Sequence, residues 1–146
     1  MYKITRYNGN FEYSHLLDLD YPSKCSNVHG HSGKFNITLY ADKLDSNYMI
    51  FDFKILSEIV KEIEDKFDHS LIISKLFYEK YKFDDLIVNK SKLVVIDHNP
   101  TAEYLATLIA DYIKLKLEEK KIVSITKLVV EFFETENNSA SVMITL

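Results

Sequence analysis

The chain has 146 residues, 47% of them hydrophobic, which is enough to build one domain with one core over residues 1–146. Its formal charge of −4 argues against a nucleic-acid-binding surface, so any phosphate group must be bound by local contacts. A single cysteine excludes an intrachain disulfide and fits a reducing compartment. The sequence shows neither a signal-peptide core at its N-terminus nor a membrane-spanning stretch. We therefore expect a cytoplasmic protein without nucleic-acid or membrane partners.

The first third of the chain predicts two strands. Residues 2–14 are rich in Tyr, Ile and Phe, and residues 31–42 alternate between apolar and polar side chains. The apolar face of the second strand consists of Phe35, Ile37, Leu39 and Ala41. Residues 15–30 between them have the composition of a polar loop, and residues 42–47 that of a turn.

Two later segments have the periodicity of helices. Asp52 is a candidate N-cap, because its carboxylate can accept the free N–H groups of a first helical turn. A one-sided apolar stripe follows it and stops near Asp68–His69. Asn99-Pro100-Thr101 is typical of a second helix start, where Asn or Thr can cap and Pro suits the first turn.

The remaining segments complete the predicted fold. Residues 93–96 could form a short buried strand, whereas residues 74–91 show no clear pattern. Two strands, 124–134 and 140–146, close the chain. The order of elements predicts an α+β fold, with a four-stranded antiparallel sheet and two helices on one face. Its outer strands would have unpaired edges, so we expect copies of the chain to pair through them and close a barrel.

Three histidines and the only cysteine lie close together in the sequence: His15, Cys25, His29 and His31. A His-x-His pair at the start of a strand places both imidazoles on one face. A third histidine from a neighbouring strand would give three nitrogen ligands, and catalytic zinc usually has three protein ligands and one open position. The alternative is three unrelated histidines, two of them at a turn marked by Gly30.

The residues that would act beside a metal each have two interpretations. Cys25 is either a thiolate base activated by a nearby cation or a small buried apolar residue. Asp68 could orient His69 as in a proton-relay pair, or His69 could simply favour the negative end of a helix dipole. Glu134, at a strand end, is either a solvated rim residue or an anchor for a ligand with paired N–H donors. The simplest interpretation of Glu103 is a carboxylate that stabilises a helix N-terminus.

Six short motifs occur in order across nearly the whole chain: Phe11-x3-His15, Cys25-x3-His29-Gly-His31, Phe51-Asp52-Phe53, Asp68-His69, Asn99-Pro-Thr-Ala-Glu103 and Glu134-Thr135. This ordered set resembles the 6-pyruvoyltetrahydropterin synthase and 6-carboxytetrahydropterin synthase family. The resemblance implies the tunnelling fold (T-fold), in which the sheets of a trimer close a barrel. It also implies a homohexamer, formed as a dimer of trimers, with active sites between subunits.

The resemblance assigns roles to residues of this chain. It implies a zinc ion, Zn2+, on His15, His29 and His31. It implies that Cys25 is the proton-abstracting base and that Asp68 and His69 form the relay on the other side of the substrate. Glu134 would hold the amino-pyrimidine edge of a pterin, and the segment from Thr101 to Glu103 would also line the pocket.

Within the family, the three residues between Cys25 and His29 resemble the 6-carboxytetrahydropterin branch, which belongs to queuosine and 7-deazapurine biosynthesis. We therefore expect a zinc-dependent lyase that converts 7,8-dihydroneopterin triphosphate to 6-carboxy-5,6,7,8-tetrahydropterin, acetaldehyde and triphosphate. The run from Glu134 to Asn138 looks more like the pyruvoyl branch, so 6-pyruvoyltetrahydropterin is the alternative product. A member that binds a pterin or metal without turnover is a third alternative. Ser70 replaces the Leu usual after the Asp-His pair, and residues 74–92 exceed the usual length of that connection.

Overall fold

The structure is a computed structural model that describes residues 1–81, 85 and 89–146. Its strands are β1 (Tyr2–His15), β2 (His29–Ala41), β3 (Ser70–Ser74), β4 (Leu93–Ile96), β5 (Ile125–Thr135) and β6 (Asn138–Thr145). Its helices are α1 (Phe53–Phe67), α2 (Lys75–Tyr81) and α3 (Ala102–Glu119). Short 3₁₀ turns occur at η1 (Lys24–Ser26) and η3 (Lys90–Lys92).

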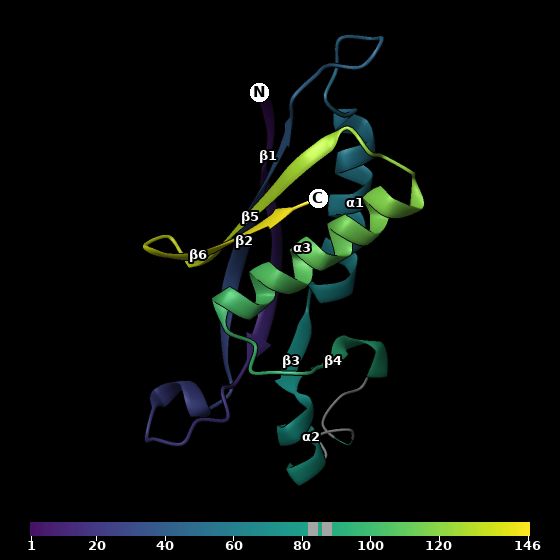
Figure 1. Ribbon diagram of the computed structural model, residues 1–146. Coiled ribbons are helices and arrows are strands. Elements are labelled where there is room, and N and C mark those ends of the chain that lie inside the picture. Colours follow the sequence, from purple (N-terminus) through teal and green to yellow (C-terminus); the bar gives the residue numbers. More distant parts are fainter. Residues whose placement is uncertain (82–84, 86–88) are drawn as a thin grey trace.

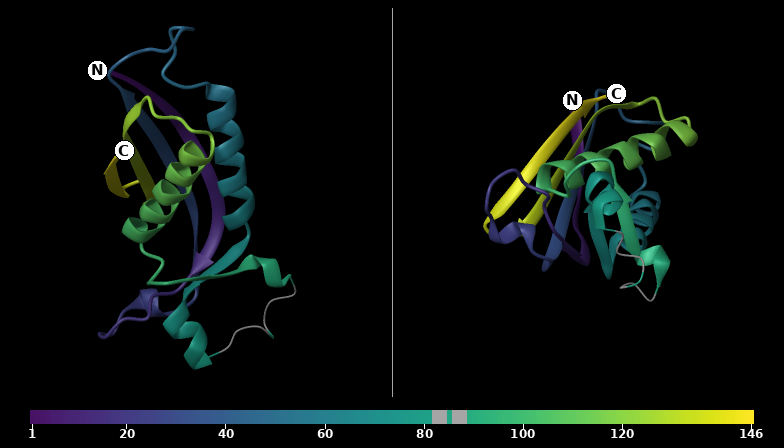
Figure 2. Two further views of the ribbon diagram at one scale, coloured as in Figure 1. Left: turned by 45° about the vertical axis from the view of Figure 1, so that its right-hand side comes forward. Right: turned by 90° about the horizontal axis from the view of Figure 1, so that it is seen from below.

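The described strands form one mixed sheet in the order β4-β3-β1-β2-β5-β6 (Figure 1). The pairs β1–β2, β2–β5 and β5–β6 are antiparallel, whereas β3 pairs in parallel with both β1 and β4. The two long helices, α1 and α3, lie on the same face of this sheet (Figure 2). The short helix α2 follows β3 directly and lies at the far end of that strand (Figure 1).

The predicted four-stranded antiparallel sheet is wrong, because the described chain has six strands and two parallel pairings. The four predicted strands are present, and they form the antiparallel part of the sheet. All five residues of β3 are buried, so this strand has no alternation of apolar and polar residues by which to recognise it. The helix α2 makes three helices in the described residues instead of two. The loop between β1 and β2 is also shorter than predicted, because the strands extend to His15 and from His29.

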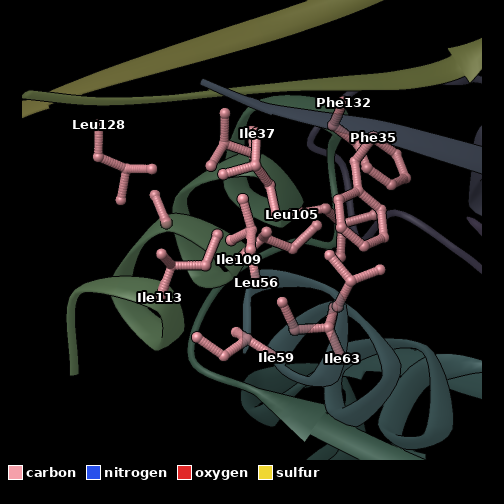
Figure 3. Packing of buried hydrophobic residues seen from close by; sticks show 14 of the residues in the cluster. Phe35, Ile37, Leu56, Ile59, Ile63, Leu105, Ile109, Ile113, Leu128 and Phe132 are labelled. Atoms are coloured by element: carbon pink, nitrogen blue, oxygen red, sulfur yellow. The ribbon is translucent and has the colours of Figure 1, made fainter. Parts of the chain in front are cut away.

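The core lies between the sheet and the two long helices (Figure 3). The predicted inward face of β2 is confirmed, because Phe35, Ile37 and Leu39 have no exposed surface. On the facing side, α3 contributes Ile109 and Ile113, which are 1% and 0% exposed. Burial of these apolar side chains on folding holds the helices against the sheet.

Both long helices begin at polar caps. The carboxylate of Asp52 accepts the backbone N–H of Lys54 at 2.7 Å, as predicted for the start of α1. The hydroxyl of Thr101 accepts the backbone N–H of Tyr104 at 3.2 Å and caps α3. Asn99, the other candidate cap, instead contacts the loop between β1 and β2. None of the described helices is long and apolar enough to cross a membrane.

The sheet is not closed within one chain. β1 pairs with β3 only through Tyr13–His15, so in the described chain most of its outer side has no strand partner. At the opposite end, β6 is an edge strand, and its Met143 is 63% exposed. Open edges of this kind present backbone N–H and C=O groups to which another chain can add strands.

Truncating the core side of α3 should destabilise the protein far more than truncating its outer side. Ile113→Ala removes a fully buried side chain, so we expect a loss of about 2–5 kcal/mol in the free energy of unfolding. Leu115→Ala, on the same helix but 48% exposed in the wild type, should cost less than about 1 kcal/mol. Urea unfolding of both variants checks this, and equal losses would contradict the described core.

Candidate active site

The pairing of β1 with β2 brings the three histidines together. His15 lies opposite His29, and Tyr13 lies opposite His31, so all four side chains share one face of the sheet. One ligand atom from each histidine lies within 4.8 Å of those from the other two. The structure thus assembles the three histidines that the sequence singles out, and their role as zinc ligands stays a prediction.

The hydrogen bonds around the histidines leave nitrogen lone pairs facing one another. His15 donates from Nδ1 to the carbonyl of Pro100 at 2.8 Å, and His29 donates from Nδ1 to the carbonyl of Asn27 at 2.7 Å. A carbonyl only accepts, so each neutral ring presents an unprotonated Nε2. These two Nε2 atoms are 3.0 Å apart. Two lone pairs at this distance repel, whereas a cation bound to both would satisfy them, so the donor set fits a metal ion.

His15 is the most enclosed of the three, with 1% of its surface exposed. Its pKa is lowered to about 4, mainly by burial and to a smaller extent by the neighbouring His29 and His31, against the opposing effect of the Pro100 carbonyl. His15 is therefore neutral at physiological pH. This is the form in which an imidazole ligates a metal.

Cys25 lies on η1 within the loop between β1 and β2, and its thiol is partly exposed. Its carbonyl accepts the backbone N–H of Leu17 at 2.8 Å, which folds the loop back on itself. Cys25 is not one of the residues whose ligand atoms cluster with the histidines. Its role as a base stays a prediction.

Asn99 holds the Cys25 loop in place, a role that its sequence context as a helix start does not reveal. Its side-chain amide accepts the backbone N–H of Asp18 and donates to the carbonyl of Asp18, both at 2.9 Å. The Asp18 carboxylate also forms an ion pair with Lys80 of α2 at 2.9 Å. Pro100, the next residue, supplies the carbonyl that orients His15. One short segment therefore fixes both the loop and a histidine.

Asp68 and His69 form the contact expected of a relay pair. The Oδ2 atom of Asp68 accepts from Nδ1 of His69 at 2.8 Å, while Oδ1 accepts the backbone N–H of Glu12 at 2.9 Å. These two hydrogen bonds, led by the one from Glu12, lower the pKa of Asp68. His69 has a left-handed backbone, with φ of 57°, and a side chain that is 78% exposed. It lines a cleft of about 820 Å³ that His31 also borders.

Glu134 lies beside the histidines at the end of β5. Its Oε1 atom is 3.5 Å from Nε2 of His31, and its side chain is 28% exposed. Glu134 and His31 border a second hollow of about 520 Å³. Neither Thr101 nor Glu103 borders these two spaces. Thr101 caps α3, and Glu103 is exposed in the first turn of that helix. Any contact of these two residues with a substrate stays a prediction.

Tyr13 is a residue of the site that the sequence motifs do not single out. It is 4% exposed, and its ring lies 5.1 Å from the ring of His15 and 5.7 Å from that of His31, between centroids. Burial raises its pKa above the usual range, and the Glu134 carboxylate adds to this effect. The signal in the sequence is its position two residues before His15, which places it on the same strand face.

Comparison with known proteins shows the family to which the chain belongs. The model of the family described as 6-pyruvoyl tetrahydropterin synthase matches residues 3–144. The chain belongs to this family.

Relatives and solved structures agree with that membership. A protein named 6-carboxy-5,6,7,8-tetrahydropterin synthase from Rickettsia conorii is 31% identical over 140 residues, covering 94% of this chain and 96% of that protein. One of the same name from Aquifex aeolicus is 32% identical over 121 residues, covering 81% of this chain and 75% of that protein. The 6-pyruvoyl tetrahydropterin synthase structure from Plasmodium vivax superposes with a TM-score of 0.76 at 17% identity, covering 99% and 98% of the two chains. That likeness shows a shared fold.

The three-histidine centre should lose its metal when one ligand is removed. We expect about one zinc per subunit in the purified protein, and a large loss in His29→Ala and in His31→Ala, because two imidazoles hold zinc much more weakly than three. Elemental analysis measures this, with His98→Ala as a control outside the cluster. Unchanged zinc in both ligand variants would rule out this site.

Proposed function

We propose that this chain is a zinc-dependent lyase that converts 7,8-dihydroneopterin triphosphate to 6-carboxy-5,6,7,8-tetrahydropterin, acetaldehyde and triphosphate. The observation that carries the proposal is the cluster of three imidazoles, two of them with Nδ1 held on carbonyls, in a chain of this family. The names of the relatives from Rickettsia conorii and Aquifex aeolicus support the carboxy product. The reaction would serve queuosine and 7-deazapurine biosynthesis in the cytoplasm.

The residues around the cluster divide the chemistry between them. A bound zinc ion would supply a Lewis acid for the side-chain oxygens of the substrate. Cys25, as thiolate, would remove a proton from the substrate side chain. His69 would exchange a proton on the opposite side, with Asp68 holding its Nδ1–H so that Nε2 faces the substrate. Glu134 would accept the two adjacent N–H groups of the pterin pyrimidine edge.

A second product has support from specific observations. The matching family model is described by the pyruvoyl product, and the run from Glu134 to Asn138 resembles that branch. Mass spectrometry of the products from 7,8-dihydroneopterin triphosphate separates the possibilities. Acetaldehyde with the 6-carboxy product supports our proposal, and 6-pyruvoyltetrahydropterin supports the alternative. Absence of both products would indicate a member that binds without turnover.

Removing the thiol should abolish most turnover without removing the metal. For Cys25→Ala we expect a loss in kcat of about 10²–10⁴-fold, the usual effect of losing a general base, with zinc content unchanged. Steady-state kinetics and elemental analysis check both parts. Ser26→Ala, on the same 3₁₀ turn, is the matched control and should retain activity. Loss of zinc from Cys25→Ala would make the cysteine a ligand and contradict its assignment as base.

Glu134 should be needed for pterin binding but not for metal binding. Glu134→Gln replaces an acceptor oxygen with a donor that faces the donors of the pterin, so we expect affinity to fall by about tenfold or more. Glu131→Gln is the control, because Glu131 lies on the opposite strand face, where its Oε1 atom accepts from the Ser139 hydroxyl at 3.0 Å. Calorimetric titration with 7,8-dihydroneopterin compares them. Equal affinities would mean that Glu134 is only a rim residue.

We also propose that the chain assembles as a homohexamer, a dimer of trimers. The open edges of β1 and β6 support this, because their pairing between copies would close the sheet. Within one chain, Cys25 does not border the cleft that contains His69. A site shared between subunits would bring a Cys25 and a His69 to the two sides of one substrate. Light scattering at micromolar concentration should therefore give about six times the 17.1 kDa of one chain. A monomer would overturn the assembly and the shared site together.

A further inference from the structure

Two buried polar atoms in the described part of the chain have no hydrogen-bond partner, and both belong to one place. They are the hydroxyl of Tyr13 and the Nε2 of His31, on side chains opposite each other in the β1–β2 pair. Leaving such an atom unsatisfied costs about 1–3 kcal/mol, so each one calls for an explanation. A metal ion explains the free nitrogen of His31. It does not explain the hydroxyl of Tyr13, because a cation cannot accept the hydrogen that this group has to donate.

The Glu134 carboxylate is an acceptor beside His31, at the end of β5. It is 3.5 Å from Nε2 of His31, and its charge also acts on the phenol of Tyr13. The hydroxyl of Tyr13 does not hydrogen-bond to Glu134 in the structure, where the carboxylate lies beside His31. His31 and Tyr13 thus have the same carboxylate as a neighbour.

Gly33 makes the approach of Tyr13 to β5 possible. A Cβ atom at Gly33 would lie 2.9 Å from Cε1 of Tyr13 and 2.8 Å from Cζ of Phe132, closer than any side chain tolerates. The missing side chain lets the Tyr13 ring extend from β1 across β2 toward Phe132, with 6.0 Å between ring centroids. Glu134 follows Phe132 by two residues and therefore lies on the same strand face.

We propose that Tyr13 is a positioning residue for Glu134. A nitrogen of His31 that ligates a metal cannot donate to Glu134, so the carboxylate stays available to the hydroxyl of Tyr13. The hydroxyl of Tyr13 then donates to one oxygen of Glu134 and fixes its orientation. A carboxylate has about four acceptor sites, so it can accept this hydroxyl and two N–H groups of a pterin at once. The substrate part of this inference rests on the proposed function.

The direct test is Tyr13→Phe in zinc-loaded protein, titrated with 7,8-dihydroneopterin by calorimetry. The substitution keeps the ring and removes only the hydroxyl, so we expect affinity to fall about tenfold with zinc content unchanged. Tyr112→Phe is the matched control, because it removes a phenol that donates to Glu62, between α3 and α1 and outside the site. An affinity of Tyr13→Phe within twofold of the wild type would overturn the proposal. Loss of zinc in Tyr13→Phe would also overturn it, because the tyrosine would then support the histidines.

A second measurement decides the proposal without a pterin. Tyr13→Phe, Glu134→Ala and the double variant are compared by urea unfolding of the zinc-loaded proteins. If the hydroxyl binds the carboxylate, Tyr13→Phe lowers the unfolding midpoint in the parent but not in the Glu134→Ala background. Equal shifts in both backgrounds would show that the pair does not interact. A wild type that binds no 7,8-dihydroneopterin would refute the proposed function, and this cycle would still decide the Tyr13–Glu134 contact.

Discussion

The register of β1 against β2 is the constraint on which the rest of the site depends. The register sets His15 opposite His29 and Tyr13 opposite His31, which places four side chains of the candidate site on one face. A slip of one residue would turn the two side chains of the slipped strand to the opposite face, away from the other two. The same register sets Phe11 opposite Gly33 and Phe35 opposite Gly9, so each of these two core rings has a glycine across from it. The packing of the core therefore holds the candidate metal centre in place.

His15 is buried and His29 and His31 are partly buried, at a cost that the surrounding backbone reduces. Two of them donate to carbonyls from segments outside the sheet, at Asn27 and at Pro100. These contacts select the tautomer that leaves Nε2 free, and they do so without a charged partner. The conformation of these two segments therefore determines which ring nitrogen of His15 and of His29 carries the proton. Changes in either loop would alter which nitrogen faces the cluster.

Local patterns in the sequence predict the parts of the structure that depend on neighbouring residues. The alternation in β2, the cap at Asp52 and the His-x-His pair all follow from spacing alone. The parallel strand β3 does not, because burial on both faces removes its periodicity. The contacts of Asn99 with the loop and of Tyr13 with the histidine rings also escape such patterns. Each depends on a contact with a different strand or loop, which no spacing along the chain encodes.

The loop that carries Cys25 is joined to the rest of the molecule at few points. In the described part of the chain, besides the buried Leu16 at its start, it is held by the Asn99 amide, by the ion pair between Lys80 and Asp18, and by the hydrogen bond from His29 to the Asn27 carbonyl. Segments held by a few polar contacts open at a lower free energy than the core that supports them. As temperature rises, this loop should therefore open while the sheet and helices are still intact. Heat inactivation would then precede heat denaturation, and it would be reversible on cooling.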